Sequence, residues 1–462
     1  MKERLPNIIL VVLDTARLDR FGCYGGPDHI TPTVDSLAAD GLKIDTMISN
    51  APWTPPSHGS LFTGLYPSEH GCQWGAMRVR DSVPVTLAEW LRTLGYRTIC
   101  ATANGLISPP TGLVRGFDTF MYRDTLEGRW GRGRRRLKKL LVGGDSGGLA
   151  LNRWLAGELR AVEEPFFLYV NYFEPHWAYV PPLGTIRRVG GPRFRPLEGF
   201  WFRLTIAHRV GPWEGLARSD ARKRGIYKTL YSGEVSSADG FLGDLVSMLD
   251  RGGKLDGALL IATSDHGEHI GEHGLAEHQA SLCDHLIRVP FVARGPGLVP
   301  AGSKSGPYEF VDVFPSLARL LGASVPEHLR GRRNDLFASD RDGTGNPHTF
   351  AEWRSWDRDG RERVARNNPS YDFSSLGRDL VCVRDDRFKL VRANDGQEWL
   401  FEVGNGLDEE TDLAEEPLVL ARLRSELDSA LESWGANGAQ TVDITDTERR
   451  EIEQRLSDLG YI

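Results

Sequence analysis

Short apolar runs that end in polar residues alternate, over the first two thirds of the chain, with segments of helical periodicity. The apolar runs read NIILVVLD (7–14), RTICATAN (97–104), FFLYVNYFEP (166–175), ALLIATSDHG (258–267) and VPFVARGP (289–296). Helical segments between them include TPTVDSLAADG (31–41), TLAEWLRTLG (86–95) and VSSADGFLGDLVSMLD (235–250). Continuous apolar runs are typical of strands buried on both faces. The alternation predicts an α/β fold with a mostly parallel sheet flanked by helices.

The pattern changes at about residue 345. RDLVCVRDDRFKLVRA (378–393) and EWLFEV (398–403) predict short antiparallel strands, and EPLVLARLRSELDSALESW (416–434) predicts a terminal helix. A chain of 462 residues is also longer than a single core usually supports. We therefore expect a large α/β domain over residues 1–344 and a smaller C-terminal α+β subdomain over residues 345–462.

The composition is compatible with most classes of protein, but it limits the kinds of partner that we expect. Hydrophobic residues make up 40% and charged residues 26% of the chain, and its net charge of −7 gives no reason to expect nucleic acid. No apolar stretch approaches the roughly 20 residues that span a bilayer. The five cysteines are widely spaced and form no CxxC pair, which favours a reduced, cytoplasmic location.

Residues 122–225 form a variable region in which we expect substrate specificity to lie. This region contains a basic stretch with seven Arg or Lys between residues 129 and 139. A solvated, glycine-rich loop explains the stretch most simply. The alternative is a contact with an anionic substrate or a membrane surface.

Several polar residues follow directly on the predicted strands. In a parallel sheet the ligand site lies beyond the carboxyl ends of the strands, and Asp14, Glu174, His176, Asp265 and His266 all fall there. Taken singly, each can be a loop-capping or surface residue. Together, Asp14, Asp265 and His266 can converge on one cation, because neighbouring parallel strands bring their carboxyl ends together.

Thr54 lies in the segment NAPWTPPSHGS, where a helix is expected to begin. A Thr followed by Pro is typical of a helix N-cap followed by Pro at the first helical position. The same geometry directs the hydroxyl and the positive end of the helix dipole to one point, where an anionic ester would also meet free backbone N–H groups. Thr54 can therefore be a cap, a nucleophile, or both.

Eight segments, in order over nearly the whole chain, carry a resemblance to a known family. They are PNIILVVLDTARLDRFGCYG, TPTVDSLAADG, TPPSHGSLFTGLYPSEHG, NYFEPHWAY, SDHGEHIGEHG, VPFV, DVFPSLARLLG and EWLFEVGNGLDEETDLAEEP. These segments resemble the sulfatase family of the alkaline phosphatase superfamily. The resemblance implies an alkaline-phosphatase-like α/β domain that holds the active site and a small C-terminal domain with a four-stranded antiparallel sheet.

The chain departs from that family at the nucleophile. The sulfatase signature begins with a Cys or Ser that is oxidised to formylglycine, followed by Pro and Arg two and four positions later. Here these positions are Thr54, Pro56 and His58, and Thr is not a substrate for that oxidation. The chain thus resembles branches that use an unmodified Thr and one divalent metal, such as the lipoteichoic acid synthases. Phosphonate monoester hydrolases resemble it in the metal shell but keep formylglycine.

The metal shell and the substrate grip also differ from the sulfatase pattern. Where the family has a pair of Asp residues, this chain has Asp14 and Thr15. His266 stands at the position of the family's Asn, and His278 stands at the position of a downstream Lys. The Lys-Trp-His stretch that grips sulfate is missing. The resemblance implies one divalent ion, Mn²⁺, Mg²⁺ or Ca²⁺ with Zn²⁺ also compatible, held by Asp14, Thr54, Asp265 and His266.

Three histidines are candidate catalytic residues beside Thr54. His176 corresponds to the substrate-contacting His of the family, and its place at a strand end favours that role over the alternative, a His packed beside Trp177. His278 stands at the position of the missing Lys. His58 stands at the position of the missing Arg, and its alternative is a place on the solvent side of the first helical turn.

The remaining candidates concern substrate binding. We expect Asn104 to contact the substrate, with loop capping as the alternative. His273, in the motif GEHGL, is the other candidate. The neighbouring His269 is expected at the surface.

The residues and the resemblance together predict a metal-dependent hydrolase that cleaves a phosphoric ester, of diester or phosphonate type, or a sulfuric ester. The substrate is a small anionic ester, and the reaction passes through a covalent intermediate on Thr54. Two alternatives stay open: a phosphoglycerol-type transferase, and a catalytically inactive binding protein with the sulfatase fold.

Overall fold

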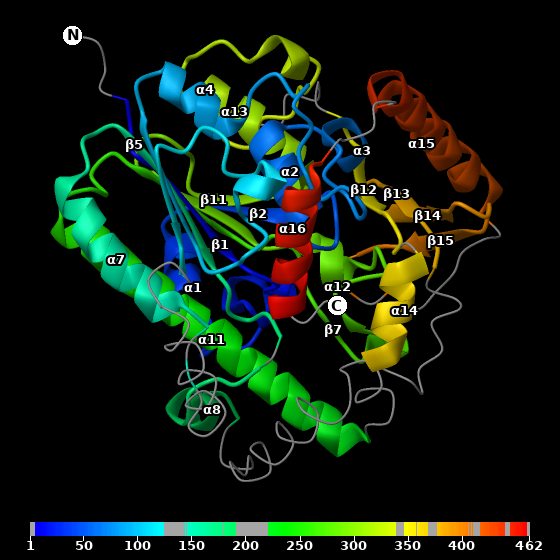
Figure 1. The fold of residues 1–462 in the computed structure, drawn as a ribbon, viewed down its shortest axis with the longest axis horizontal. Coiled ribbons are helices and arrows are strands. Elements are labelled where there is room, and N and C mark those ends of the chain that lie inside the picture. Colours follow the sequence, from blue (N-terminus) through cyan, green and yellow to red (C-terminus); the bar gives the residue numbers. More distant parts are fainter. Residues whose placement is uncertain are drawn as a thin grey trace.

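The computed structural model shows a large central sheet covered by helices on both faces, with a small sheet to one side (Figure 1). The structure describes residues 5–123, 144, 146–177, 179–190, 220–338, 346–356, 358–367, 377–404, 406–407, 409, 416–438 and 444–459. The basic stretch at 129–139 and much of the variable region lie outside these residues.

The central sheet has nine strands, in the order β11-β2-β10-β6-β1-β5-β3-β4, with β9 paired to β2. Strand β1 is parallel to both β5 and β6, and β3 is parallel to β4 and β5. Strand β10 is antiparallel to β2 and β6, and β9 is antiparallel to β2, so the predicted mostly parallel sheet is confirmed with these two exceptions. The strands are β1 (Ile8–Leu13), β2 (Leu42–Ile48), β3 (Arg97–Thr102), β4 (Thr119–Tyr122), β5 (Phe166–Tyr172), β6 (Leu259–Thr263), β9 (Arg288–Val289), β10 (Phe291–Arg294) and β11 (Gly302–Glu309).

Successive side chains of a strand point to opposite sides of the sheet, so a continuous run of apolar residues makes both faces of this sheet apolar. In β1, Ile8, Leu10 and Val12 belong to one hydrophobic cluster, and Ile9 and Val11 belong to another. Helices α2 (Thr54–Thr63), α4 (Leu87–Thr93) and α13 (Val313–Leu320) cover the first face. Helices α1 (Pro32–Ala39), α7 (Gly148–Ala161) and α11 (Ala221–Arg251) cover the second.

The second sheet is antiparallel and four-stranded, as the family resemblance implies. Its order is β12 (Thr349–Trp353), β13 (Leu380–Arg384), β14 (Phe388–Ala393) and β15 (Glu398–Glu402). One face packs on the predicted helix α15 (Pro417–Gly438), and the other contributes to the cluster around Trp53 in the large domain. Strand β12 and the last helix, α16 (Asp446–Leu459), were not predicted.

A buried ionic group joins this small sheet to the segment that contains α12 (Asp284–Ile287). Asp284, at the start of α12, pairs with Arg384 of β13 and with Lys389 of β14 at 3.0 Å. Lys389 also donates to the carbonyl of Leu282 over 2.8 Å. Other short elements of the described residues include α3 (Pro67–His70), β7 (His269–Ile270), β8 (Ala276–Glu277), α8 (Leu183–Gly190) and α14 (Arg358–Asn367).

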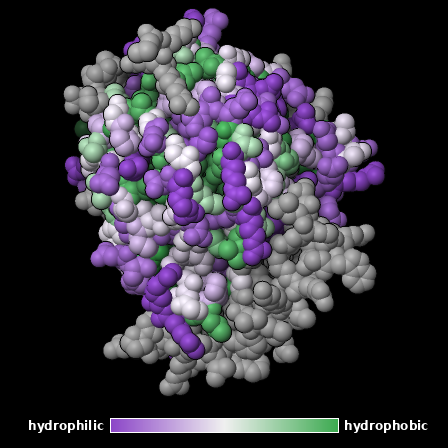
Figure 2. Space-filling model, turned by 90° about the vertical axis from the view of Figure 1, so that its left-hand side faces the viewer, coloured by the Kyte–Doolittle hydropathy of each residue, from purple (hydrophilic) through white to green (hydrophobic). Residues whose placement is uncertain are grey.

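The described part of one face of the molecule is of mixed polarity. On the side where α7 lies in Figure 1, hydrophilic and hydrophobic residues are interspersed over the described part of the face that Figure 2 shows. A search of the described residues finds no helix with the length and apolar character needed to cross a membrane. All five cysteine thiols are unpaired.

Candidate active site at the carboxyl ends of the strands

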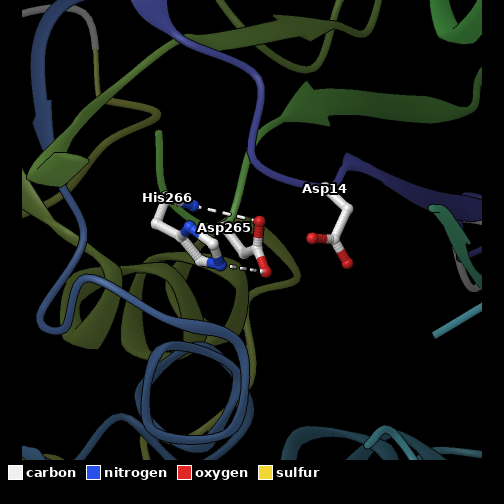
Figure 3. A group of neighbouring side chains, drawn as sticks. All are labelled: Asp14, Asp265 and His266. Carbon is white, nitrogen blue, oxygen red and sulfur yellow. Dashed lines mark hydrogen bonds and ion pairs between the residues drawn. The ribbon is translucent and has the colours of Figure 1, made fainter. Parts of the chain in front are cut away.

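Asp14, Asp265 and His266 come together at the carboxyl edge of the central sheet. Asp14 follows β1, and Asp265 and His266 lie just beyond β6, which pairs with β1 in parallel. One ligand atom from each of the three residues lies within 4.8 Å of the others, and all three side chains are fully buried. Figure 3 shows the two carboxylates and the imidazole facing one another. The convergence expected from the sequence is therefore present.

The hydrogen bonds of this cluster leave one oxygen of each carboxylate for a cation. Asp14 Oδ2 accepts from the amides of Asn104 (2.7 Å) and Asn171 (3.2 Å), and Asp265 Oδ1 accepts from the backbone N–H of Thr15 (3.0 Å). Within the described residues, no hydrogen bond reaches Asp14 Oδ1 or Asp265 Oδ2, but Asp265 Oδ2 lies 3.3 Å from Nε2 of His266, an ion pair that Figure 3 marks. A buried carboxylate oxygen without a hydrogen bond is costly unless a positive charge compensates it, and a divalent ion would supply that charge to both oxygens, so these residues fit a divalent ion.

The pKa values of the three groups also agree with a cation site. Burial, and then repulsion by Asp265, raises the pKa of Asp14 well above its ordinary value. Burial also acts to raise the pKa of Asp265, but attraction to His266 outweighs it and lowers that pKa. For His266 burial opposes protonation, yet Asp265 raises its pKa to about 9. A divalent cation would compete with that proton, because a ligating imidazole is neutral.

Thr54 is the first residue of α2, and the structure excludes the cap interpretation of its hydroxyl. The N-cap position is Trp53. Thr54 Oγ1 instead accepts from the side-chain amide of Asn104 (3.2 Å) and lies 3.4 Å from Nε2 of His266. The hydroxyl is thus directed at the Asp/His cluster and away from the helix backbone.

The expected set of free backbone N–H groups at this helix start is wrong. Pro55 and Pro56 occupy the first turn and have no N–H, and Ser57 N–H already donates to the carbonyl of Trp53 (3.3 Å). An anion beside Thr54 would therefore meet the hydroxyl and the helix dipole but few backbone donors.

Asn104 caps a loop, which is one of the two roles predicted for it, and its amide also reaches the candidate site; the predicted substrate contact stays a prediction. Its Oδ1 accepts from the N–H of Leu106 over 2.9 Å, which caps the loop after β3. Its Nδ2 bridges Asp14 and Thr54 at 2.7 and 3.2 Å. The loop bond fixes the amide orientation, so the amide N–H groups face the carboxylate and the hydroxyl.

His58 lies beneath Thr54, one helical turn further along α2. Its Nδ1–H donates to the carbonyl of Thr54 over 2.9 Å, and its Nε2 accepts from the hydroxyl of Tyr169 over 2.6 Å. Nδ1 also lies 3.7 Å from Asp265 Oδ2. The side chain is fully buried, and burial lowers its pKa, so it is neutral and holds the start of α2 in place.

His176 and His278 lie on the other side of His266. The ring centroid of His278 is 4.4 Å from that of His266 and 5.1 Å from that of His176. His278 Nδ1 lies 3.1 Å from Glu268 Oε1, and Tyr179 donates to Glu268 Oε2 over 2.9 Å. Burial lowers the pKa of both histidines, that of His176 to about 3, and raises the pKa of Glu268 to about 7.

His273 and His269 lie apart from this group. His273 is exposed and lines a cavity of about 360 Å³, whose described lining also includes Leu275, Arg378 and Trp399 but none of the other candidate residues. The expectation that His269 is at the surface is wrong: it is fully buried in β7. Burial lowers the pKa of His269 to about 3.

Sequence reasoning missed four residues of the site: Tyr169, Asn171, Tyr179 and Glu268. A signal existed for Asn171, because it is a polar residue in the otherwise apolar strand FFLYVNY. Glu268 was less visible, since a charged residue two positions after His266 in a turn would ordinarily be exposed. Only the packing of Tyr179 and His278 against it shows that it is buried.

Comparison with known proteins identifies the family. The sulfatase family model matches residues 6–323. The steryl-sulfatase of Rattus norvegicus is 26% identical over 406 residues, covering 70% of this chain and 68% of the relative. The arylsulfatase of Clostridium perfringens (strain 13 / Type A) is 24% identical, covering 75% of this chain and 81% of the relative.

Solved structures share the fold over nearly the whole chain. The phosphonate monoester hydrolase of Agrobacterium radiobacter has a TM-score of 0.71 at 20% identity, covering 96% of this chain and 98% of the other. A 2-O GAG sulfatase has a TM-score of 0.70 at 18% identity, covering 96% of each chain.

Fold and family model together define a sulfuric or phosphoric ester hydrolase of the alkaline phosphatase superfamily. The chain belongs to the sulfatase family. Enzymes of this fold use a divalent metal ion, and Asp14, Asp265 and His266 provide a matching candidate site.

Proposed function

We propose that this enzyme hydrolyses a phosphodiester or a phosphonate-type ester through a covalent intermediate on Thr54. The observation that carries the proposal is the unmodified Thr54 hydroxyl, held by Asn104 next to His266 at the Asp/His cluster. Sulfatases release sulfate from formylglycine by collapse of an aldehyde hydrate. Thr54 has no second geminal oxygen, so its adduct must be displaced at the central atom, a reaction that phosphorus supports.

The proposed ligands of one divalent cation are Asp14, Thr54, Asp265 and His266. The cation would lower the pKa of the Thr54 hydroxyl, so that it attacks as an alkoxide, and offset charge on the ester. Asn104 donates to Thr54 Oγ1 and fixes the direction of attack. His58 holds the backbone of Thr54 through its carbonyl.

The reaction then takes two displacements. Thr54 Oγ1 forms a bond to phosphorus, the bond from phosphorus to the ester oxygen breaks, and the leaving alkoxide takes a proton from His176 or His278. In the second displacement a water oxygen bonds to phosphorus, the Thr54 oxygen leaves, and the same imidazole takes the proton of the water. The Thr54 hydroxyl gives its proton to solvent when the alkoxide forms and regains one from solvent when the Thr54 oxygen leaves, and the imidazole starts and ends protonated, so protons and bonds balance.

The charge of the site agrees with a singly charged ester. The Arg of the sulfatase signature is replaced by His58, and burial lowers the pKa of His58, so this position adds no positive charge. One cation and the α2 dipole then match a diester, which carries one negative charge, better than a doubly charged monoester.

His273 is proposed to contact the organic part of the ester from the cavity that it lines. That cavity is mostly apolar and contains Trp399 and Phe401, with Arg378 as a cation. The segment from Leu275 to Leu282 lines it and also contains His278. We also propose a cytoplasmic location, because all five thiols are unpaired.

Intact-protein mass spectrometry after brief exposure to candidate esters tests the nucleophile. A phosphoryl adduct mapped to Thr54 supports the proposal, and a second alcohol that accelerates its loss would identify a transferase. An adduct on another residue, or turnover by Thr54→Ala, would overturn the assignment. A protein that binds metal and esters but forms no adduct and no product would be an inactive member of the fold.

A further inference from the structure

The C-terminal helix α16 packs on the loop that follows β3. Arg455 of α16 donates from Nη1 to the carbonyl of Gly105 over 3.0 Å, although the two residues are 350 positions apart in the chain. The guanidinium carbon of Arg455 also lies 5.4 Å from the centre of the Tyr122 ring. Because Gly105 directly follows Asn104, α16 contacts the segment that carries an amide of the candidate site.

The space between α16 and this loop is closely filled. A Cβ added at Gly105 would lie 3.0 Å from the hydroxyl of Tyr122 and 3.8 Å from Cβ of Arg455. The first distance is shorter than an ordinary contact, so the absence of a side chain at Gly105 lets both neighbours approach the backbone. Hydrogen bonds from a charged guanidinium group are among the stronger ones in proteins. The contact between Arg455 and Gly105 can therefore fix the loop.

The apolar side chains of α16 are attached to the same region. The helix is mostly charged, but Ile452 and Leu456 are buried. Both belong to the hydrophobic cluster that also contains Leu106, in the loop, and Trp53, which directly precedes Thr54. In Figure 1 α16 is the red helix in the middle of the view. The helix thus packs beside the segments that hold the candidate nucleophile and its amide partner.

From these contacts we propose that Arg455 is a positioning residue that aligns the amide of Asn104 with the candidate nucleophile. This inference rests on the proposed function. The Asn104 amide donates to Asp14 Oδ2 over 2.7 Å and to Thr54 Oγ1 over 3.2 Å, so a shift of the loop changes both contacts. Arg455 holds the carbonyl of the next residue in the loop. The site is therefore complete only when α16 is docked on this loop.

Replacing Arg455 by Met should lower kcat and leave KM nearly unchanged. Met keeps an apolar side chain but removes the donor to Gly105, and Asn104 orients the attacking hydroxyl group. We expect kcat for bis(4-nitrophenyl) phosphate to fall by about 10- to 100-fold, because a misplacement of about 1 Å can cost roughly 10²-fold in rate. Arg455→Lys keeps a cationic donor and should restore part of the activity.

Arg78→Met is the matched control, because Arg78 holds the first turn of the same helix. Its Nη1 pairs with Glu448 Oε1 at 2.6 Å, and the N–H of Glu448 donates to the hydroxyl of Thr445 over 3.2 Å. Arg78 also lies 3.4 Å from the carbonyl of Pro110, further along the chain than Asn104. We expect both variants to melt at a lower temperature, but only Arg455→Met to lose kcat.

Hydrogen exchange measures the position of the loop without a substrate or a metal. The N–H of Leu106 donates to Asn104 Oδ1 over 2.9 Å, and the N–H of Ile107 donates to the Asn104 carbonyl over 3.2 Å. In Arg455→Met these two amides should exchange faster than in the wild type. In Arg78→Met their exchange should stay at the wild-type rate, although α16 has lost an anchor.

A double-mutant cycle tests whether Arg455 acts through Asn104. In the Asn104→Ala background, Arg455→Met should cause no further fall in kcat. The affinity for Mn²⁺, measured from the rise in Tm, should follow the same pattern, because Asn104 donates to a proposed metal ligand. Loss of such an outer partner costs roughly 10- to 100-fold in metal affinity, so we expect a rise of about 10-fold in Kd for each single variant and no more for the double variant.

Three results would overturn the inference: independent losses in the cycle, equal losses of kcat in Arg455→Met and Arg78→Met, or unchanged exchange of the loop amides in Arg455→Met. If only sulfate esters are hydrolysed, the proposed function fails, and the same variants are compared with 4-nitrophenyl sulfate. If no ester is hydrolysed, the proposed function also fails, and hydrogen exchange and the Mn²⁺ cycle decide whether Arg455 positions Asn104.

Discussion

Thr54 Oγ1 lies 3.4 Å from Nε2 of His266. This separation is long for a hydrogen bond but suits two ligands of one cation, since metal–ligand bonds of about 2.0–2.6 Å place neighbouring ligand atoms roughly 3–3.7 Å apart. The two residues are 212 positions apart in the chain, and both are fully buried. This short distance places the candidate nucleophile next to the candidate metal site.

Replacing Asp265 by Asn should remove most of the affinity for a divalent cation. The carboxylate oxygen that lacks a hydrogen bond is lost, and we expect the dissociation constant to rise by more than about 100-fold, exceeding the cost of changing an outer-shell partner. Thermal melting with increasing Mn²⁺ measures this, because a cation that binds the folded state raises Tm.

Asp239→Asn is the control for this measurement. Asp239 is also a buried carboxylate, but it accepts the N–H groups of Thr33 and Val34 at the start of α1, each over 3.0 Å. Its variant should keep the Mn²⁺-dependent rise in Tm. An equal rise in Asp265→Asn would remove Asp265 from the metal shell.

Thr54→Ala should abolish turnover and leave the fold intact. The hydroxyl makes no cap bond in α2, so stability should change by less than the roughly 1 kcal/mol of a lost N-cap. Loss of a nucleophile costs several orders of magnitude in kcat. Thr54→Ser should retain part of the activity because its hydroxyl can occupy the same place.

Thr63→Ala serves as the comparison at the other end of α2. The Thr63 hydroxyl is also buried, and it donates to the carbonyl of Gly59 over 2.7 Å. We expect this variant to melt at a lower temperature and to keep full kcat. Comparable activity of the Thr54 and Thr63 alanine variants would contradict the nucleophile assignment.

The enzyme should prefer a phosphodiester to a sulfate ester. We expect a higher kcat/KM for bis(4-nitrophenyl) phosphate than for 4-nitrophenyl sulfate, because the Thr54 adduct must be resolved by attack at the central atom. Release of 4-nitrophenol measures both reactions with the same signal. A higher value for the sulfate ester would reverse the choice of ester while leaving the family assignment unchanged.

The free energy of unfolding should fall as the pH rises, because the carboxyl group of Glu309 is buried. This carboxyl group is buried and accepts hydrogen bonds from the side-chain amide of Asn50 (3.0 Å) and from the N–H of Phe350 (2.9 Å). Burial and, to a smaller extent, repulsion by Asp312 raise its pKa from 4.5 to about 8. Because the folded state favours the protonated form, this contribution is present below about pH 4.5 and is lost as the pH rises to about 8.

Glu309→Gln should flatten that dependence, since its amide imitates the protonated carboxyl group. Urea midpoints at about pH 5 and pH 8 measure the slope for each protein. Glu402→Gln, on the edge strand β15, should retain the wild-type slope. A slope that is the same in Glu309→Gln and in the wild type would show that Glu309 ionises normally.

By itself the sequence determined the layered architecture, because apolar runs and helical periodicity depend on local spacing. It predicted the strands that became β1, β3, β5 and β6, and the placement of Asp14 and Asp265 at their carboxyl ends. Strand β12 was missed because TFAEW is short and weakly patterned, and α16 because DTERREIEQRLSDL is mostly charged. Their burial depends on contacts with distant segments.

Only the tertiary structure decided how the candidate side chains are used. Spacing could place Thr54 at the start of a helix, but the direction of its hydroxyl follows from Asn104, which is 50 residues away. Burial of Glu268 and His269 likewise depends on segments that pack over the His266 turn. The physical reason is that hydrogen-bond partners and desolvation are set by neighbours in space, whereas periodicity reports only neighbours along the chain.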